Sequence, residues 1–171
     1  MAAATPQLIY PSFAENYIRL AGSTCPKEAQ QLHGTALIQF YSALPAARAH
    51  ERYAPEKWSM QEVMQHIIDT ERIFVYRLLC ILRNEKNTLL PFDENAFALA
   101  AKTDAVSWEQ TMAEWQSSRE ATSIMLQGIP ETGWDKIGQV GDYRISARAI
   151  GLLLTGHQLH HRHILIARYR C

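Results

Sequence analysis

The six residues WSMQEV, which begin at Trp58, constrain the fold strongly because they mark the start of a helix. Ser59 is placed to cap that helix, and Glu62 three residues later completes a capping box. Trp58 before the cap and Val63 at the fourth helical position fit a hydrophobic staple. Apolar residues then recur with helical spacing, so we predict a helix over residues 59–84.

Three more long helices are predicted from similar signals. Ser107 and Ser146 are placed to cap two of them, and Pro26 suits the first turn of another. A shorter helix can precede them, since residues 12–15 have the pattern of a second capping box. The expected long helices cover residues 26–45, 107–128 and 146–168.

These segments predict an all-α fold, a four-helix bundle. We expect one domain over residues 1–171, with residues 1–22 as an N-terminal arm or short helix, and four antiparallel long helices. The link between the second and third long helices, residues 85–107, is long enough to cross the bundle, so that neighbours need not simply alternate up and down. It includes a possible helical turn at residues 93–102, and a small turn or hairpin fits residues 140–145.

Composition narrows the function classes. Lys+Arg and Asp+Glu number 17 each, which gives a formal net charge of zero and argues against a nucleic-acid partner. Three widely spaced cysteines indicate reduced thiols and not a disulfide framework. No apolar run is long enough for a membrane span, and the N-terminus lacks the pattern of a signal peptide. We therefore expect a cytoplasmic protein without a membrane partner.

Four of the seven histidines lie within the nine residues GHQLHHRHI, which begin at Gly156. At about 100° per residue, His157 and His161 fall in the middle of the apolar stripe of the predicted helix, one turn apart. His160 falls at the edge of the stripe and His163 well outside it. Each buried neutral imidazole needs a donor and an acceptor, so two in one stripe suggest a shared metal ion.

A metal site needs at least one more ligand from another helix. His66 lies at the border of the apolar stripe of the helix over residues 59–84, and His33 lies in the first long helix. His50 falls in a charged linker, where we expect it to be solvated. Periodicity alone does not choose between His33 and His66. Gln158 stands where a zinc protease of the HExxH kind needs a glutamate as general base, which argues against that peptidase chemistry.

The combination of motifs resembles the DinB/YfiT-like superfamily from about Tyr17 to Tyr169. The motifs are KWSMQEVMQHIIDTERIFVYRLLCILR, then PFDENAFA, an R-x-A-T pattern that begins at Arg119, and GHQLHHRHILIARYR. The resemblance implies a four-helix bundle with a long crossover and a divalent metal held by three histidines. Carried over position by position, it implies the ligands His66, His157 and His161, and so selects His66 over His33 by analogy.

Three imidazole ligands leave coordination positions open, as in a catalytic site. The metal could be Zn²⁺, Ni²⁺, Mn²⁺ or Fe²⁺, because three nitrogens discriminate weakly among these ions. The resemblance implies a metal-dependent enzyme that activates water or a low-molecular-weight thiol, for hydrolysis or thiol transfer on a small molecule. The alternative is a non-catalytic metal-binding protein of the damage-inducible stress-response kind.

Three further residues are candidates for catalysis. Glu71 falls near the centre of an apolar stripe and is either a base or, with greater weight, a buried carboxylate paired with Arg77, Arg119 or Arg148. Asp69 could orient the His66 ring, or be a solvated charge. His160 could relay protons near the open position, or have no role.

A homodimer is also expected. Leu152, Leu159 and Ile166 repeat every seven residues on the side of the last helix that faces away from the predicted core. An exposed apolar row usually marks a contact surface, and a second copy of the chain could cover it. The competing explanation is that the crossover or the segment from Leu8 to Tyr17 covers the row within one chain.

Overall fold

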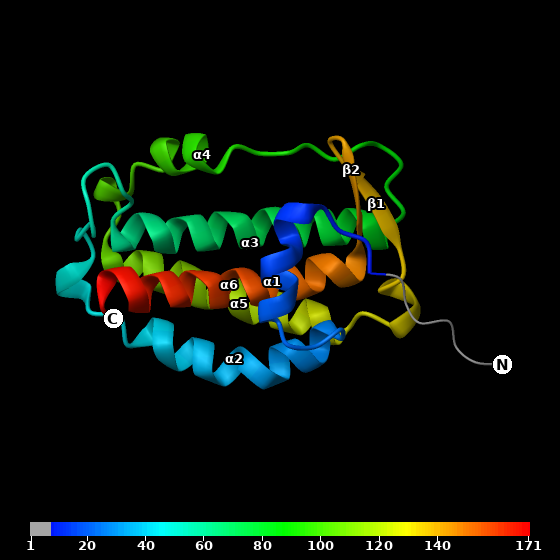
Figure 1. Ribbon diagram of the computed structural model, residues 1–171, viewed down its shortest axis with the longest axis horizontal. Helices are drawn as coiled ribbons and strands as arrows, with labels where there is room; N and C mark the ends of the chain where they lie inside the picture. The colour runs from blue at the N-terminus through cyan, green and yellow to red at the C-terminus, as the bar shows by residue number, and fades with distance from the viewer. Residues whose placement is uncertain (1–7) are drawn as a thin grey trace.

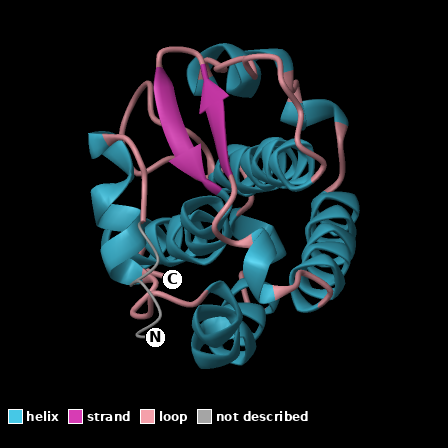
Figure 2. Ribbon diagram, turned by 90° about the vertical axis from the view of Figure 1, so that its right-hand side faces the viewer, coloured by secondary structure: helices cyan, strands magenta, loops and turns pink. Residues whose placement is uncertain are grey.

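The computed structural model describes residues 8–171 and has four long helices packed as a bundle (Figures 1 and 2). The long helices are α2 (Pro26–Ser42), α3 (Met60–Leu82), α5 (Trp108–Gln127) and α6 (Ala147–Tyr169). Two short helices, α1 (Glu15–Leu20) and α4 (Glu94–Ala100), and two strands, β1 (Ile137–Val140) and β2 (Tyr143–Ser146), complete the fold together with four 3-10 turns. The predicted all-α four-helix bundle is therefore confirmed.

The starts of α3, α5 and α6 follow the capping signals in the sequence, whereas the capping box suggested at residues 12–15 does not form, because neither the 3-10 turn there nor α1 has a side-chain cap. Ser59 accepts a hydrogen bond from the backbone N–H of Glu62, whose carboxylate accepts from the N–H of Ser59, which completes the predicted capping box. Ser107 and Ser146 accept from backbone N–H groups in the first turns of α5 and α6. Each cap satisfies donors that a helix leaves unpaired, and so fixes where the helix begins.

The helix directions differ from the antiparallel arrangement that the sequence suggested. In Figure 1, α3 and α5 run left to right, whereas α2 and α6 run right to left. Because α3 ends at the hairpin end and α5 begins at the opposite end, the chain between them must return along the bundle. This crossover carries α4, which lies over α3 in Figure 1. The long link predicted between the second and third long helices thus makes these two helices parallel.

The only sheet in residues 8–171 is a two-stranded antiparallel hairpin, with Val140 paired to Tyr143 at its turn. It lies near one end of the bundle, where Trp134 and its neighbours form one large apolar cluster. A second large cluster surrounds Trp115 further along the bundle. Within the same residues, no helix combines the length and the apolar character that crossing a membrane requires.

The apolar row that suggested a dimer is mostly covered within the chain. Leu152 is fully buried against Ala21 and Ala29, and Leu159 is 5% exposed within the cluster around Trp115. Only Ile166 of the three is exposed. The expectation of an exposed row was wrong because α1 and α2 both pack on this side of α6, which removes the surface from which the dimer was argued.

Gly156 allows α1 to cross α6 directly above the histidine segment. A Cβ atom at this position would lie 2.0 Å from the carbonyl oxygen of Tyr17. Because that neighbour is backbone, it can move away only if α1 moves as a whole. The glycine that precedes His157 in the sequence therefore lies where the backbone of α1 packs closely against α6.

We expect Gly156→Ala to destabilise the protein by about 1–3 kcal/mol, because the added methyl group overpacks the contact with Tyr17. Thermal unfolding followed by circular dichroism measures the change. Gly34→Ala is the matched control, since a Cβ atom at that helical position meets nothing within 4 Å. Equal stability of the two variants would contradict the close approach of α1 to α6.

Candidate metal centre

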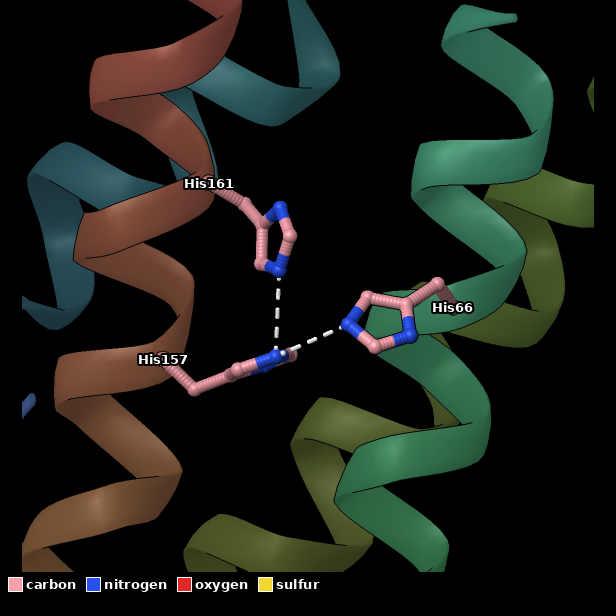
Figure 3. A group of neighbouring side chains, drawn as sticks. All are labelled: His66, His157 and His161. Carbon is pink, nitrogen blue, oxygen red and sulfur yellow. Dashed lines mark hydrogen bonds between the residues drawn. The ribbon is translucent and has the colours of Figure 1, made fainter. Parts of the chain in front are cut away.

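Three histidine rings from two helices converge inside the bundle (Figure 3). His66 comes from α3, and His157 and His161 lie one turn apart on α6. The Nε2 atom of His157 lies 3.0 Å from Nε2 of His66 and 3.1 Å from Nε2 of His161. Each of the three residues offers a ring nitrogen, and these nitrogens all lie within 4.8 Å of one another.

Burial keeps these rings neutral. Each of the three residues is 6% exposed. Burial, with a smaller contribution from His160, lowers the pKa of His66 from 6.5 to about 4. Burial and the neighbouring imidazoles hold the pKa values of His157 and His161 well below the ordinary value. Neutral imidazole is the form that binds a metal ion, so the environment favours the ligand state.

The arrangement fits a metal ion better than it fits hydrogen bonds among the rings. A single proton can join two of the converging Nε2 atoms, but it leaves the third without a partner of opposite polarity. A cation accepts all three lone pairs at once. Two nitrogen ligands at about 2.0–2.1 Å from one ion lie about 3.0–3.4 Å apart, which matches the two short Nε2 separations. The three residues thus have the chemistry and spacing of a three-nitrogen metal site.

The outer ring atoms have few polar partners. Nδ1 of His66 lies 3.5 Å from the Thr70 hydroxyl, and Nδ1 of His161 is buried without a hydrogen-bond partner among the described residues. Asp69, for which the sequence left open orienting His66 or a solvated charge, accepts a hydrogen bond from Gln65 at 3.0 Å. Thr70, one turn after His66 on α3, is the polar neighbour of the His66 ring, and the sequence analysis did not predict it as a residue that orients this ring.

Aromatic rings cover the cluster from both sides. The ring of Trp58 lies 4.8 Å from that of His66, and the ring of Tyr17 lies 5.6 Å from that of His157. His160 is half-buried and packs edge-on against Tyr17 and His161. These contacts fix the ring orientations and place His160 beside the cluster but not in it.

The remaining histidines lie elsewhere. His33 is half-buried beside Gly22, and among residues 8–171 it does not belong to the group of side chains placed to share a metal ion. His50 is exposed, with its Nδ1 3.8 Å from Asp104, and His163 is exposed on α6. The structure therefore brings together the three histidines that the resemblance selected.

Glu71 is paired with an arginine, the alternative to which the sequence gave greater weight. Its Oε1 lies 3.0 Å from Nη1 of Arg119, and its Oε2 accepts a hydrogen bond from Gln158 at 3.1 Å. The contact with Arg119 is an ion pair without hydrogen-bond geometry, since neither atom has a hydrogen-bond partner in the described chain. This buried network links α3, α5 and α6 next to His157 of the histidine cluster.

Two cavities reach the histidine cluster. One, of about 260 Å³, is lined by His66 and His157, and the other, of about 250 Å³, is lined by His161. The crossover contributes Glu94 to the first cavity and Asn95 to the second. The sequence gave no direct signal for these walls, because they combine residues from α1, α3, the crossover and the hairpin. The wall of the first cavity includes Tyr17, Thr70, Phe74, Arg77 and Tyr143.

The metal-free protein is expected to lose stability as the pH falls from 6.5 towards 4. In the unfolded chain His66 takes up a proton near pH 6.5, but in the folded protein it stays neutral until about pH 4, so acid favours the unfolded state. Between pH 7 and pH 5, His66 alone accounts for roughly 2 kcal/mol of this loss. Chemical denaturation of chelator-treated protein at pH 7 and pH 5 measures it, and equal stability at both would contradict the neutral cluster.

Two comparisons with known proteins gave matches, one to a family model and one to a solved structure of the same fold. A family model described as the DinB superfamily matches residues 31–165. The solved structure of YfiT from Bacillus subtilis superimposes with a TM-score of 0.70 at 16% sequence identity, covering 99% of this chain and 94% of that one. YfiT is described as a probable metal-dependent hydrolase with an unusual four-helix bundle topology. No match was found among curated proteins.

Proposed function

The chain belongs to the DinB superfamily, and we propose that it is a divalent-metal-dependent enzyme in which His66, His157 and His161 hold the ion. The convergence of their Nε2 atoms supports this role, as does the description of YfiT as a probable metal-dependent hydrolase. Zn²⁺, Ni²⁺, Mn²⁺ and Fe²⁺ all remain suitable ions, because imidazole ligands accept each of them.

The chemistry that such an ion supplies is activation of a nucleophile. A divalent ion with three imidazole ligands keeps coordination positions open and lowers the pKa of a water or thiol bound there. We propose hydrolysis or thiol transfer on a small molecule, with water or a low-molecular-weight thiol as the nucleophile.

The observation that carries the proposal is the cavity of about 260 Å³ against His66 and His157. A closed structural metal site has no use for such a space, whereas a substrate needs it. The hydroxyl of Thr70 and the charged groups of Arg77 and Glu94 also line the cavity. These polar groups come from α3 and α4, and a few such groups around an apolar pocket are typical of a small-molecule site.

The side chains around the cavity have separable roles. Tyr17 packs its ring edge-on to His157 and His160, and so shields the cluster from bulk water on that side. Phe74 packs against His157 from α3 and gives the cavity an apolar wall. Glu71 holds Arg119 and Gln158 in the neighbouring network, so we assign it a positioning role and not that of a base.

The test begins with elemental analysis of the purified protein. Protein loaded with each candidate ion is then assayed for hydrolysis of small aryl esters, and for consumption of a low-molecular-weight thiol in the presence of 1-chloro-2,4-dinitrobenzene. We expect metal-dependent, saturable turnover in one of the two assays, and its loss on chelation. A protein that retains one equivalent of metal but turns over neither class of substrate supports the non-catalytic metal-binding alternative.

A further inference from the structure

The cavity beside His66 and His157 contains a buried positive charge without a carboxylate partner. Arg77 of α3 is 5% exposed and lines this cavity. Within residues 8–171, no Asp or Glu oxygen lies within 4.0 Å of its guanidinium. Burying an unpaired charge is expensive, so such a residue is rarely retained without a ligand or another compensating group.

Two other arginines with largely buried side chains have carboxylate partners. Arg119 lies 3.0 Å from the carboxylate of Glu71. Arg148 donates to Glu131 at 2.7 Å and to Asp135 at 3.2 Å. Arg77 differs from both in having no carboxylate partner, and of these three arginines it is the one that lines the cavity beside the histidines.

The contacts of Arg77 leave most of its hydrogen-bonding capacity unused. Its Nη2 donates to the carbonyl oxygen of Leu90 at 2.7 Å, and its guanidinium lies 5.7 Å from the centre of the Phe92 ring. Both partners belong to the crossover and hold the guanidinium in one place. A guanidinium has five N–H donors in a planar fork, which suits the two oxygens of a carboxylate.

The other charge on the cavity wall does not neutralise Arg77. Glu94 lies on α4, is exposed to solvent, and is more than 4.0 Å from the guanidinium. Much of the remaining wall is aromatic, with Phe13, Phe74 and Tyr143 among its residues. A ligand that fits this space has an apolar body and presents its negative charge to Arg77.

His66, Thr70, Phe74 and Arg77 share one face of α3 at intervals of three and four residues. His66 and Arg77 lie 11 residues apart, or about 16 Å along the helix axis. The long arginine side chain shortens the gap that a ligand has to span. A ligand that reaches both ends is therefore elongated, with its charged group several bonds from the group that meets the histidines.

We propose that Arg77 binds the carboxylate of an elongated organic acid, whose apolar body lies against the aromatic wall and whose other end reaches the three histidines. The part of this proposal that places the other end of the ligand at the histidines rests on the proposed function. The carboxylate subsite does not, because it uses no metal ion. The two parts can therefore fail separately.

The probe pair is 3-phenylpropanoate and its neutral isostere 3-phenylpropanamide, titrated by ¹H NMR into chelator-treated protein. Removing the metal ensures that the carboxylate cannot bind it instead of Arg77. We expect the wild type to bind the acid about tenfold or more tightly than the amide, as a charge-assisted hydrogen-bonded pair provides. Arg77→Gln should remove this preference, and Arg77→Lys should weaken binding of the acid but keep the preference.

Two control variants locate the effect. Arg72→Gln removes a surface arginine on the same helix, which pairs with Glu114, and should bind both probes as the wild type does. Glu94→Gln removes the negative charge at the cavity wall and should tighten binding of the acid but not of the amide. Equal binding of acid and amide by the wild type overturns the proposal, even if no Arg77 variant folds.

A preference for the acid that survives Arg77→Gln also overturns it, and assigns Arg77 to holding Leu90 and Phe92 alone. The metal-loaded protein separates this failure from that of the proposed function. A chain that binds the acid through Arg77 but retains no metal contradicts only the metal centre. A chain that retains metal but shows no acid preference contradicts only the carboxylate subsite.

Discussion

Replacing His157 with alanine is expected to abolish metal retention and leave the bundle folded. His157 lies between the other two ligands, with its Nε2 3.0 and 3.1 Å from theirs, so its loss leaves two imidazoles that no longer surround one position. We expect at least a 100-fold loss of affinity, since one of three first ligands is removed. Elemental analysis after gel filtration measures the metal, and circular dichroism measures the helix content.

His163→Ala is the matched control, because His163 is an exposed histidine on the same helix. It should retain metal as the wild type does. A His157→Ala protein that keeps one equivalent of metal would contradict the assignment of the ligands. If His157→Ala does not fold, the same measurement is made on His66→Ala, which removes a ligand of the same cluster from α3.

Replacing Arg119 with leucine is expected to destabilise the protein by about 3–5 kcal/mol. The change leaves the buried carboxylate of Glu71 with the single hydrogen bond from Gln158, and so with an uncompensated charge. For a chain of this length the midpoint of thermal unfolding should fall by roughly 6–20 °C. Differential scanning calorimetry measures it on the metal-free protein, which removes any contribution from the ion.

The double variant with Glu71→Leu and Arg119→Leu provides the decisive control. Removing both charges leaves no unpaired ion, so it should be more stable than Arg119→Leu alone. Arg72→Leu breaks a more exposed ion pair with Glu114 and should cost about 1 kcal/mol or less. A double variant that is less stable than the single one would contradict the buried-pair role of Glu71.

The fold was largely predictable because its signals are local. Ser59 with Glu62, and the caps at Ser107 and Ser146, act through hydrogen bonds within one helical turn, and the sequence shows them directly. The directions of the helices were harder to predict from the sequence, because they depend on the path of the crossover and not on any single turn. The parallel pair of α3 and α5 follows from the path of the crossover over the bundle.

The candidate site was predictable only in part. The spacing of His157 and His161 places both on one face of a helix, which periodicity establishes. Periodicity could not choose His66 over His33, because the choice depends on how α3 packs against α6. The resemblance made that choice, and the structure brings His66 to the other two.

The sequence left open whether a second copy or a segment of the same chain covers the apolar row of α6, and it could not decide between them. The row containing Leu152 and Leu159 has the spacing of an exposed contact surface, but α1 and α2 cover it. Gly156 was the available signal, since a glycine within an apolar helix often marks a close approach of another segment. The cavity wall at Arg77 and Glu94 likewise depends on tertiary contacts between α3 and the crossover.

The central claim, an open metal site with three imidazole ligands, is tested most directly by X-ray absorption spectroscopy of the zinc-loaded protein. We expect one ion per chain, with three imidazole nitrogens at about 2.0–2.1 Å and at least one further oxygen from solvent. The His157→Ala variant, which should not retain the ion, provides the reference spectrum. A sulfur ligand at about 2.3 Å, a shell of four imidazoles, or an ion that His157→Ala retains would contradict the account.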